Sequence, residues 1–163
     1  MEPSESRAIN SILSAAFPNQ EFTTEPFSIS TVLPQRTFLE KIFLLHEEFS
    51  QETTKIRIDR LSRHLYDLEK LMDTEYGKAA IKDKQLYNGI VIHREKFNPL
   101  RGLDYANHIP GKIKIVPPDT VIKDWDKDYQ AMTQNMIYGE PLNFENLMKR
   151  IQKLQESINA MVH

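Results

Sequence analysis

The sequence has no cysteine and no long apolar run. Without cysteine the 163-residue chain forms neither disulfide bonds nor thiolate metal sites. No apolar stretch approaches the roughly 20 residues that a helix needs to cross a bilayer, so no membrane span is predicted. The first five residues are polar and acidic, unlike a signal peptide. These absences are compatible with a reducing cytoplasm, and we expect the protein there.

Charge of neither sign dominates the sequence. The 21 basic and 23 acidic side chains leave a net charge of −2. The chain therefore lacks the general basic excess that attracts nucleic acid, and any such contact needs a local basic patch. The apolar fraction of 40% and the charged fraction of 27% are ordinary for a soluble globular protein. The length suits one domain with its own core, so we expect a single domain over residues 1–163.

Glycine is scarce, and none occurs before Gly77. The N-terminal half therefore has no glycine-rich loop of the kind that cradles phosphates. His93, His108 and Asp104 do not have the spacing of a metal site, so we expect them at the surface and predict no metal ligands. His46 ends an apolar stripe, and we expect it to cap a helix C-terminus, where a cation is favoured.

Apolar residues repeat at helical spacing through most of the chain, which predicts a mainly α fold. The predicted helices cover residues 4–17, 36–49, 57–73, 74–82 and 84–97. Residues 21–33 differ, because Phe27, Ile29 and Thr31 alternate with serines, which predicts a short β element near residues 21–33. Residues 98–118 are rich in proline and glycine and are predicted to be irregular, with an extended piece around Ile113.

The last third of the chain carries two regular apolar stripes. One runs from Ile122 to Met136 and the other from Phe144 to Met161, each with steps of three and four residues. The connection between them is short, which predicts a C-terminal antiparallel helical hairpin. The sequence Asp124-Trp125-Asp126 lies in the first turns of this region, where carboxylates favour a helix N-terminus, so we interpret it as structural.

The first segment that could carry chemistry is residues 34–46. On its polar side Arg36 and Glu40 are four residues apart, and so are Thr37 and Lys41. One interpretation is an exposed, ion-paired helix face. The other is that Lys41 reaches toward an anionic ligand such as a triphosphate, for which a lysine is a mobile point charge.

The second segment is residues 60–71. Arg60, Arg63, His64 and Asp67 follow one another at the spacing that places them on one helix face. A solvated, charged surface would look the same. Alternatively, a carboxylate held by basic neighbours in a cleft could orient a catalytic group or a metal-bound water.

These two segments, in this order, resemble the downstream motifs of the abortive-infection nucleotidyltransferase toxins of the AbiEii/AbiGii type. In that family a Pro-x-Arg-Thr-Phe-x-Glu-Lys helix start is followed by an Arg-x-x-Arg-His-x-x-Asp-Leu helix. The region from Asp128 to Pro141, and on to Asn159, is also similar. The resemblance implies that Lys41 contacts the triphosphate and that Asp67 helps to build the active site. It gives supporting roles to Arg36, Glu40, Arg63 and His64.

The resemblance further implies transfer of a nucleotide from a nucleoside triphosphate (NTP) with Mg²⁺, onto a target such as RNA. It implies a cognate antitoxin and a role in growth arrest or phage defence. The family's metal-binding Asp-x-Asp pair follows a glycine turn upstream, and nothing before Pro34 supplies one. We therefore expect a helical C-terminal part that lacks the catalytic Asp-x-Asp region, whether fragment, truncated gene product or degenerate product, and that is inactive alone.

The alternative is a non-enzymatic helical module that binds an antitoxin or another partner protein. The predicted strands would then have exposed edges, which favour pairing with another chain or formation of a homo-oligomer. The missing Asp-x-Asp pair is the feature that separates this alternative from the enzyme.

Overall fold

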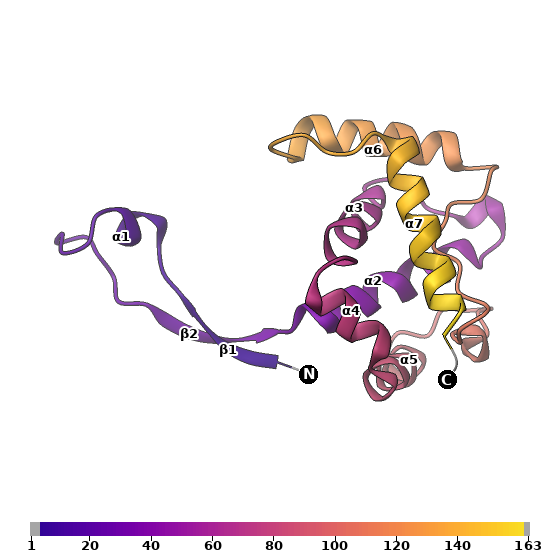
Figure 1. Cartoon of the computed structure of the whole chain (residues 1–163), viewed down its shortest axis with the longest axis horizontal. Coiled ribbons are helices and arrows are strands. Elements are labelled where there is room, and N and C mark those ends of the chain that lie inside the picture. The colour runs from indigo at the N-terminus through magenta and orange to yellow at the C-terminus, as the bar shows by residue number, and fades with distance from the viewer. Residues whose placement is uncertain (1–3, 162–163) are drawn as a thin grey trace. The chain divides into compact units, whose positions relative to one another are not determined.

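A computed structural model describes residues 4–161 of the chain (Figure 1). Where the sequence suggested one domain, the contacts divide the chain into two compact units, Met1–Leu33 and Pro34–His163. Helices dominate the second unit, and a two-stranded sheet forms the first. The predicted mainly α fold with a short N-terminal β element is confirmed. Among the described residues, no helix combines the length and apolar character that crossing a membrane requires.

The first unit is a β-hairpin whose connection contains a short helix. Strand β1 (Ser4–Ile9) pairs antiparallel with β2 (Phe27–Val32), and α1 (Ile12–Ala16) lies between them. The strand predicted within residues 21–33 is confirmed. The helix predicted over residues 4–17 is wrong in its first half, because the backbone there pairs with β2. Only after Ser11, whose side chain accepts a hydrogen bond from the Ser14 amide, does a helix begin.

The second unit contains six α-helices among the described residues, and two short 3₁₀ turns, Thr53–Lys55 and Tyr105–Asn107. The helices follow the predicted order closely, with small differences at their ends. They are α2 (Pro34–Phe49), α3 (Ser62–Leu71), α4 (Glu75–Lys82), α5 (Lys84–Phe97), α6 (Ile122–Met136) and α7 (Phe144–Asn159).

Helix α2 is the centre of this unit. Phe38, Ile42, Phe43 and Leu45 have no exposed side-chain surface, and α3, α4 and α5 all pack against the helix. The apolar face of α2 has to be covered by other elements. The neighbouring helices pack around α2, and they bury Arg36, His46, Glu47 and Glu48 together with its apolar residues.

Helices α6 and α7 pack mainly on α3 and only slightly on each other. In Figure 1 they run across one another, so their pairing is looser than the side-by-side hairpin that their spacing predicted. Their apolar stripes are nevertheless buried as expected, with Trp125 and Leu147 fully enclosed. The stripes face the common core, since α3 offers each helix more apolar surface than the other helix does.

A carboxylate on α6 fixes the start of α3. Asp128 Oδ1 accepts a hydrogen bond from the Arg60 backbone amide at 2.8 Å, and Oδ2 accepts one from the Ser62 amide at 3.0 Å. Arg60 has φ 60°, a left-handed conformation that is uncommon for a residue with a Cβ. The hydrogen bonds that Asp128 accepts satisfy helix-terminal donors and hold this turn in place.

Side chains of α7 secure the irregular segment 98–118. Asn159 accepts hydrogen bonds from the amides of Gly111 and Ile113, both at 3.0 Å, and donates one to the Ile113 carbonyl. Gln155 accepts from the amides of Ile115 and Val116. These side-chain amides take the place of a partner strand, so Ile113 and Ile115 can be buried in an extended conformation, as their alternation with lysine predicted.

We predict opposite effects of alanine at two helical glycines. A Cβ on Gly77 would lie 2.3 Å from the backbone oxygen of Leu71, whereas one on Gly89 would meet nothing within 4 Å. Gly77→Ala should lower the free energy of unfolding by about 1–3 kcal/mol through overpacking. Gly89→Ala should raise it by about 0.5–1 kcal/mol through helix propensity. Urea unfolding followed by circular dichroism measures both, and equal effects would contradict the prediction.

Candidate functional site

Lys41 and Asp67, the two residues singled out from the sequence, form an ion pair. Lys41 Nζ on α2 lies 2.7 Å from Asp67 Oδ2 on α3. His64, one turn before Asp67 on α3, places its Nδ1 3.3 Å from the same Nζ. The packing of α3 against α2 thus brings the two sequence motifs together in one group, which we call the Lys41 cluster: Lys41, His64 and Asp67.

The Lys41 cluster lies at the boundary between core and solvent. The side chains of Lys41 and Asp67 are 19% and 39% exposed, and His64 is buried. The ammonium group has three hydrogens, and within residues 4–161 the structure directs it to two partners, Asp67 and His64. A lysine held in this way has a defined direction, and because its side chain is partly exposed, a small anion can approach it from the solvent side.

His64 is uncharged at neutral pH. Burial, which is the largest cause, and the positive charges of Lys41 and Arg63 together lower its pKa from 6.5 to about 4, whereas Asp67 acts in the opposite direction. Because an ammonium group only donates, Nδ1 of the neutral ring accepts from Lys41. This assigns the ring proton to Nε2. The imidazole thus orients Lys41 without adding a second positive charge beside it.

Glu40 links Arg36 on α2 to Arg94 on α5. Arg36 Nη2 lies 3.1 Å from Glu40 Oε1, and Glu40 Oε2 lies 2.6 Å from Nη1 of Arg94. Arg36 is buried, so the exposed, ion-paired face considered for this segment is wrong for that residue. Arg63 is exposed on α3, and its charge acts on His64 across the helix surface. Of the predicted supporting residues, His64 is therefore the one in direct contact with Lys41.

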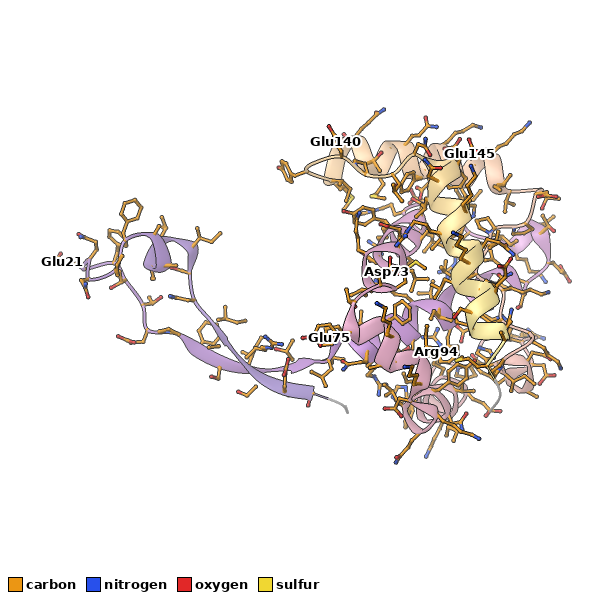
Figure 2. The ribbon with its side chains drawn as sticks, viewed as in Figure 1. Glu21, Asp73, Glu75, Arg94, Glu140 and Glu145 are labelled. Atoms are coloured by element: carbon orange, nitrogen blue, oxygen red, sulfur yellow. The ribbon has the colours of Figure 1, made fainter. Side chains whose placement is uncertain are left out.

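A buried polar network at the α2–α5 contact was not found from the sequence. Arg94, labelled in Figure 2, donates from Nε to Glu47 Oε1 at 2.7 Å and also pairs with Glu40. His108 Nε2 lies 3.3 Å from the same Glu47 oxygen. Burial raises the pKa of Glu47, but hydrogen bonds from Arg94 and His108 outweigh it and bring the pKa below its ordinary value. Glu47 is therefore a carboxylate with Arg94 as its counterion.

Two predictions about histidines are corrected by this network. His108 is buried against Tyr105, with ring centroids 4.7 Å apart, and not at the surface. His46 is also buried, and its pKa is lowered to about 4 by burial and by His108, so it is not a charged helix cap. The available signal for His46 was its place four residues after Ile42 and seven after Leu39, which puts it on the apolar face of α2.

The described residues contain no group of three or more His, Asp or Glu side chains that could hold a metal ion. The Asp-x-Asp carboxylates on α6 have structural partners, since Asp124 pairs with Lys127 at 2.9 Å and Asp126 accepts from Gln130. Asp128, which continues the same spacing, holds the start of α3. The carboxylates of residues 4–161 are therefore not arranged to hold the Mg²⁺ that the resemblance implies.

The fold and the Lys41 cluster define a mainly helical protein with a basic, partly exposed ion-paired site between two consecutive helices. The chain matches the model of the family described as "Nucleotidyl transferase AbiEii toxin, Type IV TA system" over residues 1–151, and it belongs to this family. No curated protein and no solved structure matches it. The family supports a toxin-type nucleotidyltransferase function within a toxin–antitoxin system.

We predict that the pKa of His64 reports the charge of Lys41. Lys41→Met should raise this pKa above about 4 but leave it below 6.5, because burial is the larger cause. Asp67→Asn should lower it, since the carboxylate favours the charged ring. NMR titration of the imidazole resonances measures both shifts. Lys70→Met, a control on exposed α3 surface, should leave the value unchanged, and an equal shift there would contradict the prediction.

We predict strong coupling between Arg94 and Glu47. The side chains are 14% and 4% exposed, so removing one partner leaves a buried charge uncompensated. Arg94→Met should therefore cost about 3–5 kcal/mol of unfolding free energy. The double variant Arg94→Met with Glu47→Leu should be less destabilised than the sum of the two single variants. Denaturant unfolding of all four proteins gives the coupling, and additive effects would contradict it.

Proposed function

We propose that this chain forms the nucleotide-binding helical part of a nucleotidyltransferase toxin, with Lys41 as the contact to the triphosphate. The observation that carries the proposal is the 2.7 Å ion pair between Lys41 and Asp67. It joins the two segments that resemble the family's motifs, on two different helices. Membership of the AbiEii family supplies the reaction class.

The chemistry of the Lys41 cluster suits a phosphate group. Asp67 pairs with the ammonium of Lys41, and neutral His64 directs it by accepting a second hydrogen bond. The ammonium has three hydrogens, so one more donation can go to a phosphate oxygen. In this proposal Asp67 orients Lys41 and does not itself contact the phosphates, because two anions side by side would repel each other.

The remaining parts of the reaction are proposed from the family. The reaction class implies Mg²⁺, which would supply positive charge near the phosphates, but the described residues contain no group of three or more His, Asp or Glu side chains that would hold it. The acceptor would be an RNA, and the cognate antitoxin would be a protein partner of the toxin. Arg63 is exposed beside the Lys41 cluster and supplies positive charge that favours both an NTP and an RNA backbone.

We predict that the protein binds NTPs and that Lys41→Ala weakens this binding about tenfold or more, the usual value of a charge-assisted hydrogen bond. Isothermal titration calorimetry with ATP and GTP, with and without Mg²⁺, measures the effect. Lys149→Ala is the matched control, because Lys149 forms an exposed ion pair with Glu145 on α7. Circular dichroism verifies that each variant is folded.

Two outcomes would contradict the proposed function. Equal NTP affinity for the wild type and Lys41→Ala would remove Lys41 from the site. Absence of NTP binding by the wild type would overturn the proposal as a whole and favour the non-enzymatic interaction module. Loss of affinity in Lys149→Ala as large as in Lys41→Ala would indicate unspecific attraction to positive charge.

A further inference from the structure

A polar cavity lies where the C-terminal end of α2, the segment 107–114 and helix α7 meet. Its volume is about 580 Å³. The side chains that line it include His46 and Ser50 from α2 and the loop after it, Lys112 and Lys114 from the segment, and Gln155 from α7. A volume of this size is within the range of small-molecule sites and exceeds what a single phosphate ion fills.

We propose that this cavity binds a small phosphorylated molecule, with Lys112 and Lys114 as the cationic contacts. The two lysines alternate with Ile113 and Ile115, which are buried, so both lysines are directed to the other side of the extended segment. The lining residues include no Asp and no Glu. The partner of Lys112 Nζ is the neutral amide oxygen of Asn107, at 2.9 Å.

The walls of the cavity are held in position without a ligand. Asn159 accepts from the amides of Gly111 and Ile113, which fixes the segment against α7. His46 Nδ1 accepts from the Lys114 amide at 3.1 Å, which fixes the same segment against α2. A ligand therefore does not have to order the loop on binding, and this reduces the entropic cost of association.

Neutral donors complete the cavity. Burial, together with the charges of His108 and Lys114, keeps the pKa of His46 at about 4, so the ring is uncharged at neutral pH. Gln155 uses its oxygen for the Ile115 and Val116 amides, which leaves its NH₂ group to donate. Ser50 adds a hydroxyl group. Cationic and neutral donors together match the oxygens of a phosphate ester.

The cavity is independent of the Lys41 cluster. Lys41 precedes His46 on α2 by about one and a half helical turns and contacts α3, whereas His46 contacts the segment before α6. The two groups therefore face different elements and share no residue. This proposal does not rest on the proposed function, because a phosphorylated ligand in the cavity requires neither NTP binding nor nucleotide transfer.

The test is an NMR titration of the isotope-labelled protein with inorganic pyrophosphate and, separately, with AMP. The amide signals of Gly111 and Ile113 should shift and saturate, whereas that of Gly89 on α5 should remain in place. The variant Lys112→Gln with Lys114→Gln should weaken this binding about tenfold or more. The control variant Lys82→Gln with Lys84→Gln has the same spacing on exposed surface and should bind as the wild type does.

The Lys41→Ala protein should bind pyrophosphate and AMP with the same shifts at Gly111 and Ile113 as the wild type. This result would support a separate site, and it does not depend on the outcome of the NTP-binding experiment. Three results would overturn the proposal. They are the absence of saturable shifts, shifts that persist in the Lys112→Gln, Lys114→Gln protein, and shifts that disappear in Lys41→Ala. Unchanged Gly89 and Gly139 signals verify that each variant keeps its fold.

Discussion

Helix α2 is buried on most of its sides although half of its residues are polar, and burying it requires partners for the charged side chains that it carries into the core. Glu47 and Glu48 meet this requirement through Arg94 and Arg57, and His46 through the backbone of Lys114. An unpaired charge at these positions would cost several kcal/mol, so the partners determine where α5 and the segment 107–114 lie. The arrangement of the helical unit follows from this constraint.

The same constraint shapes both sites. Lys41 lies on the partly exposed side of α2, and the packing of α3 on α2 brings Asp67 and His64 to it. At the C-terminal end of α2, the fixed segment 107–114 forms one wall of the polar cavity. The buried pair of Arg94 and Glu47 gains little net stability, since desolvation offsets much of the attraction.

The helices were predictable because each buries one face, and the residues of that face recur every three or four positions in the sequence. The hairpin was only half predictable, because Ser4–Ile9 forms a strand through pairing with Phe27–Val32, and its own residues do not specify the partner. Candidate residues Lys41 and Asp67 were predicted from a family resemblance. Their contact could not be deduced from spacing, since it depends on how α3 packs on α2.

The sequence by itself determined the helical content, the buried stripes of α6 and α7 and the family, because periodicity and short motifs are local properties of the chain. Only the tertiary structure decided that Lys41, His64 and Asp67 form one group, and that Arg94 and His108 are interior counterparts of Glu47. The physical reason is that ion pairing in a core joins residues distant in the chain. The number of residues between Lys41 and Asp67 in the sequence does not predict the 2.7 Å that separates their charges in the fold.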